Sequence, residues 1–387
     1  MRLIVDENLP FTQEFFGSHA KLIHLSGNAI TPELVKNADG LLVRSVTQVN
    51  QALLEGSQVK FVGTATIGVD HIDQPWLQEA GITFASAPGC NANSVVDYVI
   101  ASLLWLAAEQ GYCLQDKVVA VVGVGQVGGR LASRLHNYGC QVVLNDPPRA
   151  AAGEADYLGL PFVGLAEALQ AADLVCLHTP LTRDGAYPSH HLIGAKELAL
   201  LEGKVLLNAG RGGVVDQQAL NNQLNNNSAP LLLLDVFEGE PSLDTDLIQQ
   251  CRLATPHIAG YSLEGKSRGT EMIYQAWCQH LGITPSVKLA ALLPPVPVAL
   301  LTLDASCGVE EACRRAAHLC YQPLADSWRL LQALKENTAL NNGAATEAIY
   351  QQLRKNYPVR REFSSLTVKA ATPQQANALK ALGFAVV

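Results

Sequence analysis

Residues 118–132 read Val-Val-Ala-Val-Val-Gly-Val-Gly-Gln-Val-Gly-Gly-Arg-Leu-Ala, a buried strand followed by a glycine-rich turn. The first five residues are apolar and four of them are β-branched, which is typical of a strand covered on both faces. Gly123, Gly125 and Gly128 then form a G-x-G-x-x-G turn that opens a helix. Glycines at this spacing let backbone amides approach a pyrophosphate at the helix N-terminus. We therefore expect a dinucleotide site, although such glycines also mark ordinary strand-to-helix turns.

A second apolar strand, residues 141–145, ends at Asp146. This is close to the distance of about 20 residues at which an acidic residue binds the ribose hydroxyls of a dinucleotide. Because an acid at this place repels a 2′-phosphate, NAD is expected rather than NADP. Two alternatives remain open: Asp146 precedes two prolines and also suits a turn, and Arg149 is a group that accommodates a 2′-phosphate.

The composition limits the possible partners. The chain has 387 residues, of which 48% are hydrophobic, enough for two or three globular domains. A formal net charge of −8 argues against nucleic acid or an anionic membrane as the main partner. No apolar run has the length of a membrane span and the first residues resemble a strand rather than a signal peptide, so we expect a cytoplasmic protein. The nine cysteines form no C-x-x-C pair, and no cluster has metal-site spacing, so no metal is expected.

Residues 1–95 alternate short apolar strands with helical patterns, which indicates a parallel sheet covered by helices. The loops after its third and fourth strands contain Ser45 and Thr66, whose hydroxyls suit a carboxylate; a solvated turn or a helix cap is the alternative. A turn-rich segment, residues 87–94, and an apolar helix over residues 95–108 then lead to the second sheet. We expect a cleft between the two sheets, with these crossing segments as its hinge.

Later loops carry charged side chains suited to hydride transfer from a 2-hydroxy acid. Such a reaction needs a cation for the carboxylate and a base for the hydroxyl proton. Arg211, which is flanked by glycines, fits the first task and His257 the second, while Glu240 would fix the imidazole tautomer. The alternatives are a structural role for His257 and a surface position for Arg211. The strands expected to bring these loops to one edge of the sheet are residues 174–177, 205–208, 231–234 and 252–254.

Together with the glycine motif, residues 178–181, 208–212, 235–241 and 255–257 resemble the D-isomer-specific 2-hydroxyacid dehydrogenases. The resemblance covers residues 1 to about 280 and implies that Arg211, Glu240 and His257 are the catalytic set. It also implies that Ser45, Thr66 and Tyr261 bind substrate. The residues expected to bind NAD are Gly123, Gly125, Gln126, Val127, Gly128, Asp146, Thr179, Ala209, Gly210, Asp235 and Gly260.

The same resemblance implies an α/β fold with two doubly wound parallel-sheet domains and a small C-terminal α/β domain. One parallel-sheet domain is a substrate-binding lid and the other is a Rossmann domain for NAD. The expected boundaries are 1–95 for the lid domain, 96–260 for the NAD-binding domain, 261–290 for a segment returning to the lid domain and 291–387 for the C-terminal domain.

Residues 353–365 (LRKNYPVRREFSS) are similar to the tail of a family member that oxidises a small phosphorylated 2-hydroxy acid on the route to pyridoxal phosphate. This likeness implies an NAD-dependent enzyme that forms a homodimer through its C-terminal domain. One arginine of the basic cluster 354–361 is a candidate to reach phosphate in the partner's active site, with a solvated face as the alternative. Two other functions remain open: another D-2-hydroxyacid dehydrogenase, such as one for 3-phosphoglycerate, and a nucleotide-sensing corepressor.

Overall fold

The computed structural model describes residues 1–339 and 346–387. They form two compact units, each considered by itself. Met1–Asn93 and Ser262–Pro295 make up the small unit, and Ser94–Tyr261 and Val296–Val387 make up the large unit.

The small unit is a five-stranded sheet in the order β2-β1-β3-β4-β5, and all of its neighbouring strands are parallel. Its central strands β1, β3 and β4 are buried on both faces, because side chains alternate between two cores as the period of a strand requires, whereas the edge strands β2 and β5 are half-buried or exposed. Ile273, Tyr274 and Trp277 of α12 fill one of these cores. The elements are β1 (Arg2–Asp6), α1 (Thr12–Phe16), β2 (Lys21–Leu25), α2 (Pro32–Val35), β3 (Gly40–Val43), α3 (Gln51–Leu54), β4 (Phe61–Thr64), α4 (Gln74–Glu79), β5 (Thr83–Ser86) and α12 (Leu263–Leu281).

The large unit is built on a six-stranded parallel sheet in the order β13-β12-β11-β10-β6-β7. The chain adds β7 on one side of β6 and later adds β10 on the other side, so the strand order reverses between β6 and β10. In open parallel sheets ligands bind at the carboxyl ends of the strands at such a point. The strands are β6 (Val118–Val122), β7 (Gln141–Asn145), β10 (Leu174–Leu177), β11 (Val205–Asn208), β12 (Leu231–Leu234) and β13 (Leu253–Ala254), with a short hairpin of β8 (Asp156–Tyr157) and β9 (Leu160–Pro161).

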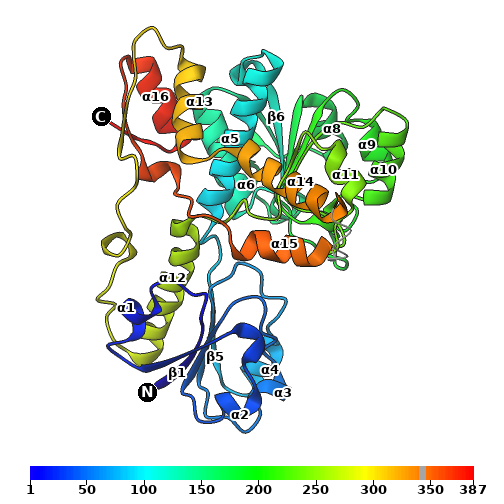
Figure 1. Cartoon of the computed structure of the whole chain (residues 1–387). Helices are drawn as coiled ribbons and strands as arrows, with labels where there is room; N and C mark the ends of the chain where they lie inside the picture. The colour runs from blue at the N-terminus through cyan, green and yellow to red at the C-terminus, as the bar shows by residue number, and fades with distance from the viewer. Residues whose placement is uncertain (340–345) are drawn as a thin grey trace. The chain divides into compact units, whose positions relative to one another are not determined.

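Helices cover both faces of this sheet (Figure 1). Val119 and Val121 of β6 face the core shared with α5 and α6, whereas Ala120 and Val122 face the core of α8 to α11. The apolar, β-branched composition of β6 is explained by this burial on both sides. The helices are α5 (Ala92–Gln110), α6 (Gln126–Tyr138), α7 (Pro147–Ala151), α8 (Leu165–Ala171), α9 (Ala195–Ala199), α10 (Gln217–Asn225) and α11 (Thr245–Gln250).

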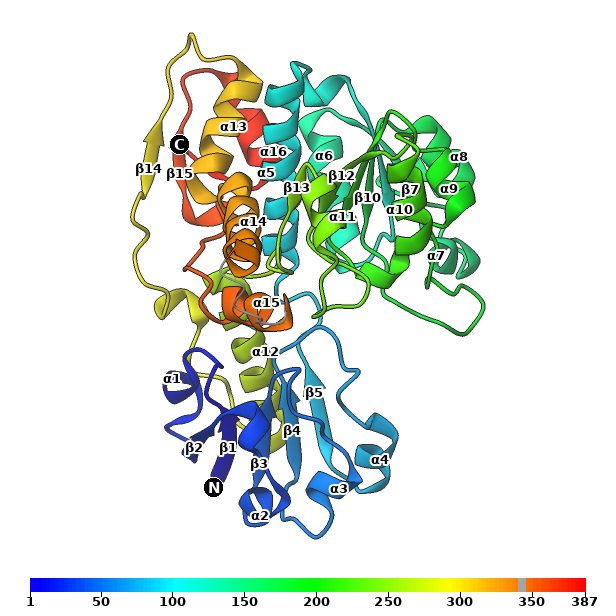
Figure 2. The ribbon, with the colours of Figure 1, turned by 45° about the vertical axis from the view of Figure 1, so that its right-hand side comes forward.

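The C-terminal segment, residues 296–387, packs on the large unit. A three-stranded parallel sheet in the order β14-β15-β16 accompanies α13 and α16, and α16 packs on α6. Helix α14 packs on the edge strand β13, where Ala254 N donates to Ser327 Oγ at 3.1 Å (Figure 2). That contact covers an edge that would otherwise be open to pairing. The elements are β14 (Leu300–Thr302), α13 (Val309–Cys320), α14 (Pro323–Ala339), α15 (Thr346–Lys355), β15 (Thr367–Lys369), α16 (Pro373–Leu382) and β16 (Ala385–Val386).

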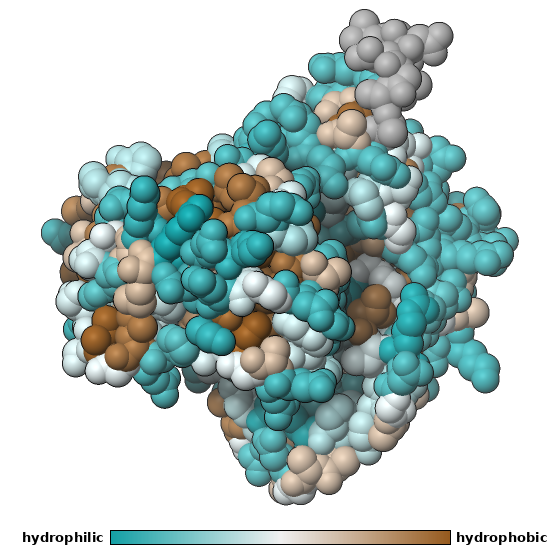
Figure 3. All heavy atoms as spheres, turned by 90° about the horizontal axis from the view of Figure 1, so that it is seen from below, coloured by the Kyte–Doolittle hydropathy of each residue, from teal (hydrophilic) through white to brown (hydrophobic). Residues whose placement is uncertain are grey.

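The expected fold class is confirmed: two parallel sheets with flanking helices and a small C-terminal α/β part. The assignment of residues 291–387 as a separate dimerisation domain stays a prediction. The face drawn in Figure 3 is mainly hydrophilic, with apolar side chains in small separate groups. Within the described residues, we find no helix whose length and hydropathy suit a membrane span.

Candidate active site

The turn after β6 is tightly packed on its protein side and open on the other. Gly123 has φ +86°, and a Cβ there would lie 2.8 Å from the backbone of His178 and Thr179. A Cβ on Gly128 would lie 1.9 Å from Gly123 O, so α6 packs on the turn only because no side chain intervenes. Around Gly125 a Cβ would meet no atom within 4 Å, and Gln126 is exposed. The start of α6, where free amides bind phosphate, is therefore accessible.

Asp146 closes the turn from β7. Its Oδ2 accepts a hydrogen bond from Val124 N at 2.7 Å, and its Oδ1 accepts one from Arg149 N at 3.1 Å and caps α7. Arg149 is the residue that suited the 2′-phosphate of NADP in the sequence analysis. Its guanidinium donates to Glu154 and to Val124 O. Because these contacts occupy the guanidinium, the geometry favours a ribose diol over a 2′-phosphate beside Asp146.

Beside this turn lie buried polar atoms that have no partner in the protein. Thr179 Oγ1 and both ring nitrogens of His178 are buried without a hydrogen bond. Burial lowers the pKa of His178 to about 4, so the ring is neutral at neutral pH. Unsatisfied buried polar groups are rare in folded proteins, and here they lie at the end of β10 against the glycine turn. The open turn, the carboxylate and these atoms fit a dinucleotide cofactor.

The loop after β11 is held by Asn208, a residue to which the sequence interpretation gave no role. Its side chain accepts from Gly210 N and donates to Arg211 O, each at 3.0 Å. A Cβ on Gly210 would lie 3.1 Å from Leu177 O, so the backbone of Ala209 and Gly210 runs against the loop after β10. The Arg211 guanidinium donates to Gly210 O at 2.9 Å and forms no ion pair with any described residue.

The loops after β11 and β12 touch at another glycine. A Cβ on Gly212 would lie 1.9 Å from Phe237 O and 2.6 Å from Glu238 N, so any larger residue would push the two loops apart. Phe237 N in turn donates to Glu240 Oε1 at 2.7 Å. The structure thus links the loop of Arg211 to that of Glu240 through backbone contacts.

Glu240 and His257 form a hydrogen-bonded pair, with His257 Nδ1 2.8 Å from Glu240 Oε2. Burial raises the pKa of Glu240, but hydrogen bonds from His257, Tyr350 and Phe237 and the charge of His257 lower it by more, and the net shift is downward. An ionised carboxylate only accepts, so Nδ1 carries the hydrogen and Nε2 keeps a lone pair. The side chain of His257 is 33% exposed and that of Glu240 is 18% exposed, so a ligand reaches the imidazole first.

Asp235 holds the loop that carries the histidine. Its Oδ1 accepts from Thr255 Oγ1 at 2.6 Å and from Ile258 N at 2.8 Å, and its Oδ2 accepts from Ala259 N at 3.0 Å. Burial raises the pKa of Asp235 to about 6, opposed by the charge of His257 and by these hydrogen bonds. The backbone of His257 has φ +54°, a value that residues other than glycine rarely adopt. Its N donates to Asp235 O at 2.8 Å. These contacts of Asp235 lie within the protein, and its contact with NAD stays a prediction.

The C-terminal segment reaches this pair through α15. Tyr350 donates its hydroxyl to Glu240 Oε2 at 2.7 Å. One helical turn later, the Arg354 guanidinium lies 5.1 Å from the Tyr350 ring centre and 5.5 Å from that of Tyr261. Tyr350 was missed from the sequence, because 110 residues separate it from Glu240 and no motif links the two.

Of the basic cluster, Arg360 is buried against backbone of its own chain. It is 6% exposed, and its guanidinium donates to Ser94 O and Ala259 O and lies 4.5 Å from the Tyr321 ring centre. These hydrogen bonds come from Nη2, whereas the buried Nη1 has no hydrogen-bond partner, so a role for this arginine in a partner's site stays a prediction.

Two expected substrate residues belong to the small unit, at the ends of β3 and β4. Ser45 is exposed, whereas Thr66 is half-buried. Thr66 Oγ1 lies 2.8 Å from Thr64 Oγ1 and donates to Gly68 O at 2.8 Å. Thr64 also contacts His71 Nε2 at 2.9 Å, so this loop is organised by its own side chains.

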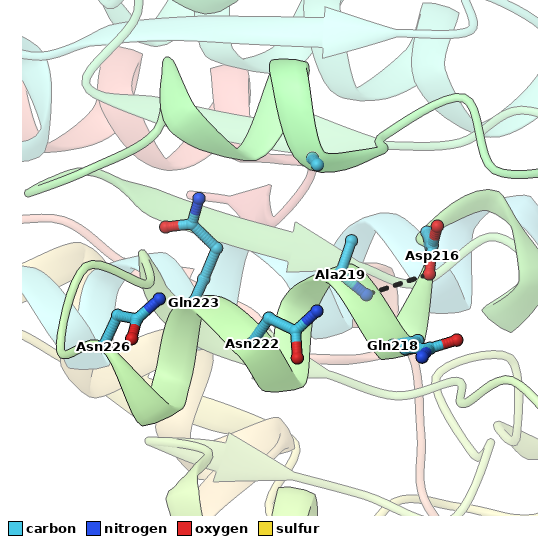
Figure 4. A pocket seen from close by; sticks show the side chains of 7 residues that line it. Asp216, Gln218, Ala219, Asn222, Gln223 and Asn226 are labelled. Atoms are coloured by element: carbon cyan, nitrogen blue, oxygen red, sulfur yellow. Dashed lines mark hydrogen bonds between the residues drawn. The ribbon is translucent and has the colours of Figure 1, made fainter.

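The large unit holds two further polar features. Ligand atoms of His190, His191 and Glu238 lie within 4.8 Å of one another, a grouping that no sequence spacing indicated. The two imidazole rings are stacked 3.8 Å apart at 23°, so their lone pairs run nearly parallel and do not converge on one ion. A pocket of about 240 Å³ lies between α9 and α10, lined by Asp216, Gln218, Asn222, Gln223 and Asn226 (Figure 4). Its lining of amides, with Asp216 bonded to Ala219 N as a helix cap, offers no catalytic group.

Sequence comparisons identify the family. A family model described as the NAD-binding domain of D-isomer specific 2-hydroxyacid dehydrogenases matches residues 97–259, and a domain of unknown function matches residues 292–383. The chain is 47% identical over 390 residues to the erythronate-4-phosphate dehydrogenase of Marinobacter nauticus, covering 99% of each protein. It is 46% identical over 390 residues to that of Pseudomonas putida, covering 100% of each. The chain belongs to the D-isomer-specific 2-hydroxyacid dehydrogenases.

This 2-hydroxyacid dehydrogenase is an NAD-dependent oxidoreductase, as the resemblance implied. Among solved structures, a D-lactate dehydrogenase from Treponema pallidum is 26% identical with a TM-score of 0.58, covering 75% of this chain and 100% of that one. A D-lactate dehydrogenase from Aquifex aeolicus, complexed with NAD and lactic acid, shares the fold with a TM-score of 0.57 at 23% identity, covering 73% of this chain and 96% of that one. The full-length relatives therefore match a part of the dehydrogenase that these lactate enzymes do not.

Proposed function

We propose that this dehydrogenase oxidises 4-phospho-D-erythronate to 2-oxo-3-hydroxy-4-phosphobutanoate, an early step in the synthesis of pyridoxal 5′-phosphate. The observation that carries the proposal is the Glu240–His257 pair, with an exposed imidazole, on loops next to that of Arg211. The full-length relatives, which bear the name of this activity, support the choice of substrate.

In this proposal Arg211 binds the substrate carboxylate and His257 Nε2 accepts the proton of the C2 hydroxyl. The imidazole becomes a cation as the C2–O bond becomes a carbonyl, and the ionised Glu240 stabilises that cation through Nδ1–H. NAD, when bound, accepts the hydride from C2. Ser45, Thr66 and Tyr261 complete the substrate contacts. The proposed cofactor contacts are Gly123, Gly125, Gln126, Val127, Gly128, Asp146, Thr179, Ala209, Gly210, Asp235 and Gly260.

The test is NADH absorbance after mixing enzyme and NAD with erythronate 4-phosphate, 3-phosphoglycerate or D-lactate, at catalytic and at stoichiometric enzyme. Of these three substrates, we expect only erythronate 4-phosphate to be turned over. Turnover with 3-phosphoglycerate instead would mean that the protein is a different D-2-hydroxyacid dehydrogenase, one for 3-phosphoglycerate. NADH binding without turnover on any of the three would contradict the proposal.

The proposed enzyme is a cytoplasmic homodimer that pairs through its C-terminal segment. Several large apolar side chains of that segment are exposed, including Trp328 at 62% and Val359 at 78%. Large apolar side chains left exposed on one segment are consistent with an interface. Sedimentation velocity is expected to give a dimer that Trp328→Glu converts to a monomer. Tyr187→Glu, at an exposed position in another loop, is expected to leave the dimer intact.

A further inference from the structure

Arg354 is a partly buried cation that forms no ion pair, and the carboxylate charge that acts on it is that of Glu240. Its Nε is buried and makes no hydrogen bond, and no carboxylate of residues 1–339 or 346–387 lies within ion-pair distance of it. The guanidinium is held instead between the rings of Tyr350 and Tyr261. A buried N–H group that makes no hydrogen bond is costly, so this unused hydrogen-bonding capacity of Nε points to an anionic ligand.

The position of Arg354 is fixed relative to the catalytic pair from two directions. On α15, Tyr350 precedes it by four residues, which places both side chains on one helix face, and the Tyr350 hydroxyl contacts Glu240. On the loop after β13, Tyr261 follows His257 by four residues and contacts the guanidinium. Arg354 thus lies against one tyrosine that is hydrogen-bonded to Glu240 and another on the loop that carries His257.

The order of the strands separates Arg354 from Arg211. Along the sheet edge, Arg211 follows β11, Glu240 follows β12 and His257 follows β13. Helix α14 packs on β13 and α15, which carries Arg354, packs on α14, so α15 is connected to the sheet through its β13 edge (Figure 2). Arg211 therefore comes to the Glu240–His257 pair on the loop after β11, whereas Arg354 comes to it on α15.

Other cations near this place in the large unit are already engaged. Arg360 donates to backbone carbonyls, Arg134 pairs with Asp97, and Arg329 pairs with Asp326. Lys355, the neighbour of Arg354, is exposed. Besides Arg211, Arg354 is a described basic residue that is close to the pair and forms no ion pair.

We propose that Arg354 binds the phosphate of the substrate and so makes this site selective for a phosphorylated 2-hydroxy acid. The proposal rests on the proposed function. A 2-hydroxy acid whose carboxylate lies on Arg211 and whose hydroxyl lies on His257 directs its far end toward Arg354. A guanidinium binds phosphate through two parallel N–H···O bonds. The segment that supplies Arg354 matches a domain separate from the NAD-binding domain, and the relatives named for a phosphorylated substrate share it.

The test compares Arg354→Met with Lys355→Met, a matched loss of one charge on the next residue. For Arg354→Met we expect the KM for erythronate 4-phosphate to rise roughly 10- to 100-fold. The kcat/KM for unphosphorylated D-erythronate is expected to change less than about 2-fold, and Lys355→Met to match wild type on both substrates. Equal losses on both substrates would mean that Arg354 supports Glu240 and would overturn the phosphate site.

Two additions keep the test decisive. If Arg354→Met does not fold, Arg354→Lys replaces it, with a smaller loss confined to the phosphorylated substrate as the expected result and equal losses as the contrary one. Calorimetric titration with inorganic phosphate is expected to show binding to wild type and at least roughly 10-fold weaker binding to the variant. If wild type binds phosphate through Arg354 but does not oxidise erythronate 4-phosphate, the proposed function fails while the phosphate site stands. Equal phosphate binding by both proteins would overturn the site.

Discussion

The two halves of one sheet edge hold their functional groups in different ways. After β7, β6 and β10 the site consists mainly of backbone, with Gly123 and Gly128 in contact and Gly125 open. After β11, β12 and β13 it consists of charged side chains, and Glu240 depends on a hydroxyl from α15. Neighbouring residues build a backbone site by themselves, so a short motif specifies it. A partly buried charge needs donors from several segments, which only the assembled fold provides.

The largest effect is expected in the catalytic half from His257→Asn. Asparagine removes the proton acceptor, so kcat should fall by roughly 10² to 10⁴. The cofactor half should be unaffected, so the dissociation constant of NADH, measured by fluorescence, should stay within about 2-fold of wild type. A comparable loss of NADH affinity would show that the two halves are not separable and that His257 is structural.

In the cofactor half, Gly128→Ala is expected to lower both stability and NADH affinity. The new Cβ would lie 1.9 Å from a backbone oxygen, which cannot move without shifting the turn. We expect a loss of about 1–3 kcal/mol in the free energy of unfolding and at least roughly 10-fold weaker NADH binding. The control is Gly129→Ala, whose Cβ would have its nearest neighbour at 3.4 Å and should be tolerated. Similar results for the two variants would contradict the packing argument.

The buried His178 makes the cofactor half sensitive to acid. Its folded pKa is lowered to about 4, so between pH 6.5 and about 4 the unfolded chain binds a proton that the folded chain does not. Stability should therefore fall as the pH drops through this range, by about 2 kcal/mol at pH 5. In urea titrations His178→Gln should flatten this slope, whereas the exposed His136→Gln should not. An unchanged slope in His178→Gln would assign the acid sensitivity to other groups.

The smallest effect is expected from Tyr350→Phe. This variant tests directly whether the catalytic half depends on a hydroxyl from a distant segment. Without this donor the Glu240 carboxylate holds the imidazolium proton more tightly, so the acidic limb of the kcat/KM profile should move to higher pH. We expect kcat at neutral pH to fall about 10-fold with the KM for NAD unchanged. The control is Tyr357→Phe, which removes a hydroxyl bonded to Asp326 at 2.6 Å instead. If kcat/KM falls by the same factor at every pH and the acidic limb stays in place, Tyr350 merely supports the fold.

Much of the fold could be read from local patterns. The strand at 118–122 was predicted because burial on both faces demands continuous apolar residues, and the structure has β6 at Val118–Val122. The strand expected at 252–254 is β13 at Leu253–Ala254, which pairs with β12 along its length. Helix α16, which packs on α6, was not predicted, since its docking depends on distant residues.

The candidate site divides in the same manner. The sequence by itself determined the glycine turn, the acid after β7 and the loops that carry Arg211, Glu240 and His257, because each depends on residues adjacent in the chain. Only the tertiary structure decided that Asp235 holds the histidine loop, that Arg360 is used internally and that Tyr350 and Arg354 lie beside the catalytic pair. Those contacts join residues 23 to 110 positions apart, and no local pattern records which distant side chain will satisfy a buried charge.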